Sequence, residues 1–97
     1  MYRYIRSSNT DTDGVAKIML TNSPGGFKYS HRNVYMLANN EYDAKSLGSN
    51  LAQSLGYGRS GEYKVIYPCT EYTPDELVHR LDEYSVNGLT YYESDYQ

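Results

Sequence analysis

Cys69 is the first candidate when the sequence is searched for a nucleophile. It follows a predicted strand and precedes a predicted helix, where a helix N-terminus can lower the pKa of a thiol. A phosphatase-like loop would need an arginine six residues later, and Asp75 occupies that position. The two histidines, His31 and His79, are the candidate bases, and no pattern brings either close to the cysteine. Since a lone cysteine is usually a small buried apolar residue, the sequence favours a protein that is not an enzyme.

Two further patterns imitate ligand-binding motifs. Residues 56–61 match G-x-G-x-x-G, but a dinucleotide site needs those glycines after a strand and before a helix, and here the order is reversed. Residues 11–14 begin like a calcium loop, yet Ala16 and Asn22 stand where the motif needs glycine and glutamate. One cysteine and two distant histidines provide no metal-ligand spacing. The sequence therefore predicts neither a cofactor nor a metal.

Carboxylates are concentrated in the C-terminal part of the chain. Residues 1–70 contain eight Lys/Arg and five Asp/Glu. Residues 71–97 contain one Lys/Arg and seven Asp/Glu. Such asymmetry is typical of a charged partner-binding surface, although an ordinary solvated helix face is the simpler alternative. Thirteen tyrosines, one phenylalanine and no tryptophan add contact chemistry that protein interfaces favour. A small core can hardly hold all thirteen tyrosines, so some must be exposed. The predicted partner-binding residues are Asp75, Glu76, Asp82, Glu83, Glu93 and Asp95.

A second candidate surface alternates basic and aromatic residues near the N-terminus. Exposed aromatic rings can stack on single-stranded bases while Lys and Arg pair with phosphates. The sequence pI of about 5.2 is far below the basic values typical of such modules, and cross-strand aromatic pairs explain the same residues. This alternative nucleic-acid face consists of Tyr2, Arg3, Tyr4, Arg6, Lys28, Tyr29 and Arg32.

The elements that must position these residues centre on residues 33–58. Residues 33–38 alternate as a strand, Asn40 is suited to cap a helix, and apolar residues then recur at three- and four-residue spacing. Gly56 and Gly58 can supply the left-handed end of that helix. A shift of thirty positions aligns residues 33–58 with residues 63–88, which suggests a second unit of strand and helix. Here Thr73, Pro74 and Glu76 form a capping-box signature.

The remaining segments read as strands and turns. Residues 2–6 and 15–21 alternate as strands, a turn is predicted at residues 23–26, and residues 27–29 extend a partner strand. The second helix is expected to continue to about residue 85, with a last strand at residues 89–93. Alternatively, Asn87 and Gly88 form the turn of a hairpin that shortens this helix.

The fold prediction is a single α+β domain over residues 1–97. It has an N-terminal antiparallel β-ribbon (residues 1–32), a first βα unit (33–58), and a second βα unit with the last strand (63–93). This β-α-β-α-β order would place two helices on one face of a mixed sheet. No apolar run is long enough for a membrane span, no secretory signal is recognisable, and the cysteine count fits a reducing, cytoplasmic setting.

In size and composition the chain is loosely similar to small accessory proteins of phages and mobile elements, including inhibitors of bacterial defence nucleases. That resemblance implies an anti-defence (anti-CRISPR-like) inhibitor whose acidic surface imitates nucleic acid. The functional prediction is therefore a non-enzymatic protein-binding domain whose partner is another protein, itself a candidate nucleic-acid binder. Single-stranded nucleic-acid binding is the alternative. Exposed tyrosines on an edge strand would also suit a homodimer.

Overall fold

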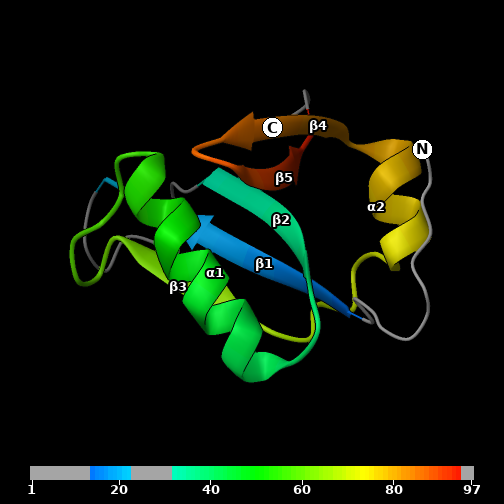
Figure 1. Ribbon diagram of the computed structural model, residues 1–97, viewed down its shortest axis with the longest axis horizontal. Coiled ribbons are helices and arrows are strands. Elements are labelled where there is room, and N and C mark those ends of the chain that lie inside the picture. The colour runs from blue at the N-terminus through cyan, green and yellow to red at the C-terminus, as the bar shows by residue number, and fades with distance from the viewer. Residues whose placement is uncertain (1–13, 23–31, 95–97) are drawn as a thin grey trace.

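The computed structural model describes residues 14–22 and 32–94, which form one sheet and two helices (Figure 1). The strand predicted at residues 2–6, the turn at 23–26 and the extension at 27–29 lie outside the described residues. Within those residues the α+β class is confirmed. The elements in chain order are β1 (Gly14–Leu20), β2 (Arg32–Ala38), α1 (Glu41–Ser54), β3 (Tyr63–Ile66), α2 (Pro74–Arg80), β4 (Asp82–Val86) and β5 (Leu89–Glu93).

The sheet is antiparallel between every pair of neighbouring strands, in the order β3-β1-β2-β5-β4. The prediction of a mixed sheet was wrong. After β2 the chain passes through α1 and returns as β3, but β1 lies between these two strands and pairs antiparallel with both. The spacing in the sequence indicated a strand-helix-strand connection. It did not reveal that β1 lies between the two connected strands in the sheet.

β1 separates two apolar clusters because its alternate side chains point to opposite faces of the sheet. Ala16, Ile18 and Leu20 face α1 and pack with buried residues of that helix, among them Leu51. We call this side of the sheet the α1 face. Gly48 lets the helix approach closely, because a Cβ added there would lie 2.7 Å from Val65 Cγ2. This cluster forms the larger part of the core.

The second helix covers the opposite side of the sheet, which we call the α2 face. Leu77 is fully buried and packs with Val15 of β1, Tyr35 of β2 and Tyr92 of β5. Figure 1 shows α2 away from α1, at the end of the sheet where β4 begins. The prediction that both helices pack on one face was therefore wrong. The apolar odd-numbered side chains of β1 and β2 point to the side of the sheet away from α1, and α2 buries them there.

Both helices begin at the predicted caps. The Asn40 side chain accepts a hydrogen bond of 2.8 Å from the backbone N–H of Asp43, and Gly56 ends α1 with a φ of 96°. Thr73 and Glu76 form the reciprocal capping box at the start of α2, with Pro74 in the first helical position. Neither helix is long and apolar enough to cross a membrane.

α2 ends at Arg80 rather than near residue 85, so the hairpin alternative is correct. Leu81 adopts an extended conformation (φ −113°, ψ 160°) and is buried beneath the helix. Asn87 and Gly88 have φ values of 50° and 81°, as a two-residue hairpin turn requires. β4 then pairs with β5 over its whole length. Residues after α2 that were expected to continue the helix thus pair with β5 as a strand.

Candidate protein-binding surface

Two of the six predicted acidic residues, Glu76 and Glu93, accept hydrogen bonds from nitrogens of the fold. The Glu76 side chain accepts a hydrogen bond of 2.9 Å from the backbone N–H of Thr73, and its own N–H donates to Thr73 Oγ1 at 3.1 Å. Glu93 accepts two bonds from the guanidinium of Arg32, 2.7 Å from Nε and 2.9 Å from the terminal nitrogen. Neither carboxylate is a good candidate for partner binding.

The pairing of Arg32 with Glu93 joins residues that the sequence assigned to two rival surfaces. The bond to Glu93 is the main reason why the pKa of Arg32 is raised, and a hydrogen bond with Tyr57 adds to it. A bidentate pair of this kind is stronger than a single exposed ion pair. Arg32 is the one residue of the predicted nucleic-acid face among the described residues, and its charge is used within the fold.

Three of the six acidic residues remain exposed on consecutive elements. Asp75 lies in the first turn of α2, and Asp82 and Glu83 begin β4. Glu83 accepts a hydrogen bond of 3.2 Å from the hydroxyl of Tyr92, which reaches it on the α2 face. Asp95 lies outside the described residues. We call Asp75, Asp82 and Glu83 the α2–β4 acidic surface.

Carboxylates elsewhere in the described chain all accept a bond from a nitrogen. Lys17, Arg32 and Lys45 each pair with one of them, and two others accept from backbone N–H groups. No cation of the described residues pairs with Asp75 or Glu83 within ion-pair distance. Arg80 and His79 are exposed at the end of α2, and His79 Nδ1 lies 2.9 Å from the carbonyl oxygen of Asp75. Within the described residues, the carboxylates of Asp75 and Glu83 thus accept no bond from a nitrogen.

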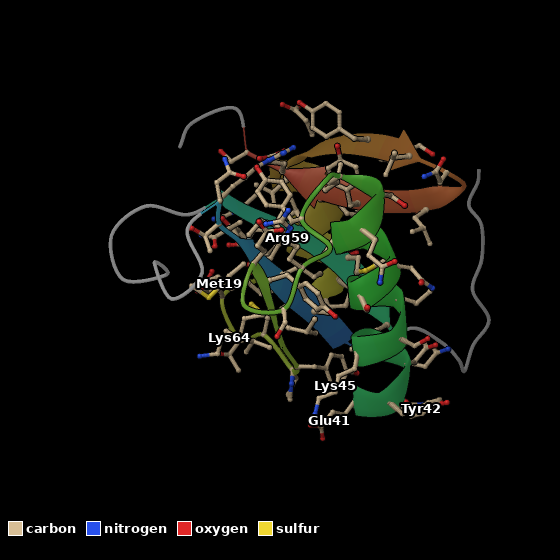
Figure 2. The ribbon with its side chains drawn as sticks, turned by 90° about the vertical axis from the view of Figure 1, so that its left-hand side faces the viewer. Met19, Glu41, Tyr42, Lys45, Arg59 and Lys64 are labelled. Carbon is tan, nitrogen blue, oxygen red and sulfur yellow. The ribbon has the colours of Figure 1, made fainter. Side chains whose placement is uncertain are left out.

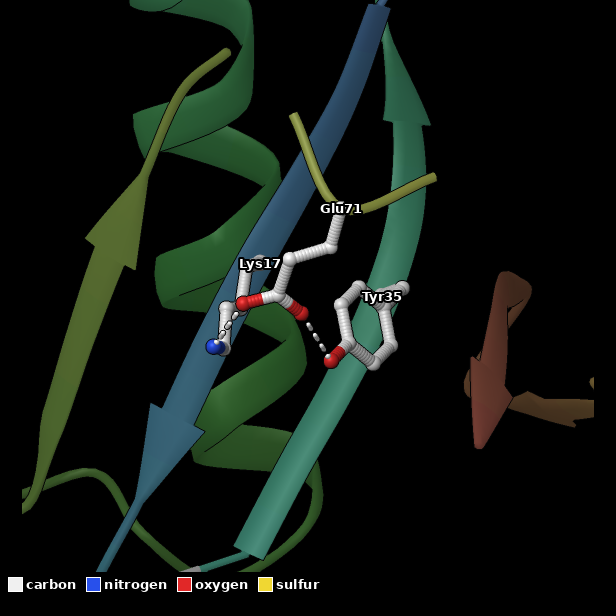
Figure 3. A network of polar contacts seen from close by, with 3 residues as sticks. All are labelled: Lys17, Tyr35 and Glu71. Atoms are coloured by element: carbon white, nitrogen blue, oxygen red, sulfur yellow. Dashed lines mark hydrogen bonds and ion pairs between the residues drawn. The ribbon is translucent and has the colours of Figure 1, made fainter. Parts of the chain in front are cut away.

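Glu71 has a structural role that its contribution to the charge of the C-terminal segment does not reveal. Its two carboxylate oxygens contact Lys17 Nζ at 2.6 Å and the hydroxyl of Tyr35 at 2.9 Å (Figure 3). The loop before α2 is thereby attached to β1 and β2 on the α2 face. Strand alternation could have placed Lys17 and Tyr35 on one side of the sheet. No local pattern in the sequence indicates that Glu71, far along the chain, contacts them.

The contacts in this network shift the pKa values of Glu71 and Tyr35. The bond from Lys17 is the main reason why the pKa of the Glu71 carboxyl is lowered. Burial, followed by the hydrogen bond to Glu71, raises the pKa of the Tyr35 phenol. These directions agree with the contacts, in which the Glu71 carboxylate accepts from both Lys17 and the Tyr35 hydroxyl.

Most tyrosines in the described residues are used inside the fold. Tyr35, Tyr91 and Tyr92 are buried, the hydroxyl of Tyr63 hydrogen bonds to a serine of α1 at 2.9 Å, and that of Tyr67 donates to a β2 carbonyl at 3.3 Å. These hydroxyls connect neighbouring layers of the molecule.

Two tyrosines confirm that part of the set is exposed. Tyr42 is 85% exposed and Tyr84 is 40% exposed. Figure 2 shows Tyr42 extending from the first turn of α1, on the opposite side of the helix from Glu41 and Lys45. Tyr84 follows the acidic pair of β4 and belongs to the same edge of the sheet.

Cys69 lies in the apolar cluster under α2, with 8% of its surface exposed. His79 is exposed, and His31 lies outside the described residues. Across residues 14–22 and 32–94, no three His, Cys, Asp or Glu side chains gather as a metal site would require. An open cleft of about 470 Å³ is lined by Asn50, Gln53, Ser54, Asn87 and Leu89, none of which is a general acid or base at neutral pH.

Comparisons with known proteins do not identify a relative. No protein-family model matches the chain, and neither the search of curated proteins nor that of solved structures gives a significant match.

Proposed function

We propose that this chain is a non-enzymatic binding protein that contacts a basic protein through the α2–β4 acidic surface. The supporting observation is the distribution of its carboxylates. Those elsewhere in the described chain accept bonds from nitrogens of the fold, whereas the α2–β4 surface exposes Asp75 and Glu83 with no such bond to their carboxylates. Exposed charge that the fold does not neutralise is available to steer and orient an oppositely charged partner.

The partner class follows from the chemistry of this surface. Carboxylates recognise Arg and Lys side chains, and Tyr84 of β4, on the opposite face of the strand from Glu83, adds a partly exposed aromatic ring on which a guanidinium can stack. A protein with a phosphate-binding face presents such cations. The proposed activity is therefore inhibition of a nucleic-acid-binding protein, as in an accessory protein of a phage or mobile element acting against a defence nuclease.

The test compares two double variants that change net charge equally. Asp75→Asn with Glu83→Gln removes charge from the acidic surface, and Glu41→Gln with Glu62→Gln removes it elsewhere. The probe is a fluorescent arginine-rich peptide, and its binding is followed by anisotropy at low and physiological salt. We expect about tenfold weaker binding for the first pair and little change for the second.

Equal losses in the two double variants would show that the peptide responds to net charge alone, and the proposal would fail. Failure of the unmodified protein to bind the peptide at low salt would also contradict it. Circular dichroism of both variants shows whether the fold is retained.

A further inference from the structure

The sheet ends in two strands that differ in how well they are protected against pairing. β3 has four residues, carries Lys64 and is followed closely by Pro68. A short strand, a lysine and a proline are the usual protections of an edge. β4 is the other outermost strand among the described residues; it contains neither lysine nor proline, and its two charged residues, Asp82 and Glu83, are confined to its start. Its ladder with β5 has no bulge, so β4 is the edge that can accept another strand.

The register of the β4–β5 hairpin determines which backbone groups of β4 face outward. A two-residue turn at Asn87 and Gly88 makes the flanking Val86 and Leu89 a hydrogen-bonded pair. Alternate residues of β4 then bond to β5, and the N–H and C=O groups of Glu83 and Ser85 point away from the sheet. These two residues form the backbone template of the edge.

We propose that two copies of this chain associate through their β4 strands, pairing antiparallel about a two-fold axis at Tyr84. In this register Glu83 of each copy lies opposite Ser85 of the other, and both pairs exchange their N–H and C=O hydrogen bonds. The acidic start of one strand meets the uncharged end of the other. Two five-stranded sheets thereby become one continuous antiparallel sheet.

Neighbouring symmetric registers are less favourable. A centre at Glu83 would place the two Glu83 carboxylates directly opposite each other, and like charges in that position are destabilising. A centre at Ser85 would require Asn87 to pair with Glu83, but Asn87 has a φ of 50° and is not extended. The charges and the turn therefore select the register centred on Tyr84.

The side chains on both sides of the edge suit a second copy. Tyr84 stacks on Tyr91, with ring centroids 5.5 Å apart and an angle of 27° between the rings. In the proposed register the two Tyr84 residues form a pair without hydrogen bonds, where side chains approach most closely. On the other face, the hydroxyl of Ser85 can donate to Glu83 of the second copy. The Tyr84–Tyr91 stacks of the two copies would then form one row of four rings.

The association brings the acidic surfaces of the two copies close together. Added salt should therefore strengthen the dimer by screening this repulsion, whereas it should weaken binding to a basic partner. The opposite salt dependence separates this proposal from the proposed function, so that either can fail alone.

The decisive variants are Ser85→Pro and Ser85→Ala. Proline removes the outward N–H of Ser85 and leaves the bonds of β4 to β5 intact, as is tolerated on an edge strand. Both substitutions remove the Ser85 hydroxyl, but alanine keeps the backbone N–H. Sedimentation equilibrium over a dilution series should show dimers of the unmodified protein and Ser85→Ala, and a monomer for Ser85→Pro.

A monomeric unmodified protein throughout the dilution series at high salt would overturn the proposal, as would a Ser85→Pro variant that dimerises normally. If Ser85→Pro does not fold, Tyr84→Lys replaces it, because two ammonium groups at the axis would repel each other. Hydrogen exchange provides a test without substitution. The amides of Glu83 and Ser85 should become more protected as concentration rises, and unchanged exchange would contradict the pairing.

Discussion

Individual carboxylates of this chain have different roles that their spacing in the sequence does not reveal. Glu76 caps α2, Glu93 holds Arg32, and Glu71 attaches a loop to the sheet. Among the carboxylates that the structure describes, Asp75, Asp82 and Glu83 combine exposure with a common location. Each role depends on what lies within about 3 Å of the carboxylate oxygens, so residues of one type separate into structural and surface groups.

At the residue scale, Glu71→Gln should lower the free energy of unfolding by about 1 kcal/mol at neutral pH. The amide keeps the shape of the side chain but loses the charge that Lys17 contacts at 2.6 Å. Glu41→Gln is the matched control, because Glu41 and Lys45 are 66% and 65% exposed and such a pair contributes little. Urea unfolding measures both variants.

The contribution of Glu71 should also depend on pH. Its pKa is lowered from 4.5 in the folded protein, so the stabilisation is complete above pH 4.5 and is lost as the pH falls through the folded value. The difference in unfolding free energy between the unmodified protein and Glu71→Gln should therefore shrink in acid. A difference that stays constant down to the acid transition would show that the ion pair has no role in stability.

At the scale of elements, the helices and the last hairpin follow from local chemistry once their neighbours are known. Capping residues define both helix starts. The end of α2 was ambiguous because residues 82–86 are mediocre helix formers that also suit a strand. The left-handed turn at Asn87 and Gly88 and the Tyr84–Tyr91 stack favour the hairpin.

Gly48→Ala should destabilise the protein by about 1 kcal/mol, although alanine is the better helix former. The new methyl group would lie 2.7 Å from Val65 Cγ2 and 3.2 Å from Ile18 Cγ1, in a core that has little room to yield. Ser46→Ala on the exposed side of α1 is the control and should be neutral or slightly stabilising. Thermal unfolding compares the two, and a more stable Gly48→Ala variant would contradict the close packing of α1 on β3.

At the scale of the whole molecule, charge pairing changes how the asymmetry of the sequence is interpreted. Lys17 and Arg32 come from the basic part of the chain and neutralise Glu71 and Glu93 from the acidic part. The two predicted surfaces are thus partly joined within the fold, and the acidic surface that remains is smaller than the sequence suggested. Within residues 14–22 and 32–94 it is confined to α2 and β4.

This distribution predicts weak binding to nucleic acid. Arg32 is committed to Glu93, and the net charge of −3 opposes approach to phosphates. We expect no salt-sensitive change in the fluorescence anisotropy of a random single-stranded oligonucleotide between low and physiological salt. An affinity that falls steeply with salt would instead favour the face formed by Tyr2, Arg3, Tyr4, Arg6, Lys28, Tyr29 and Arg32.

Residues close together in the chain are enough to specify the local features of this protein. The alternation of β1 and β2, the caps at Asn40 and Thr73, and the end of α1 at Gly56 depend on residues close together in the chain. Hydrogen bonds and steric limits acting over a few residues are sufficient to specify them.

Long-range packing sets the strand order, the separation of the helices onto two faces, and the partner of each carboxylate. β1 lies between β2 and β3, and Glu71 meets Lys17 and Tyr35 across long stretches of sequence. Such contacts depend on how apolar faces of distant elements are buried together, and any one segment is compatible with several arrangements. The candidate surface was therefore predictable in composition but not in extent.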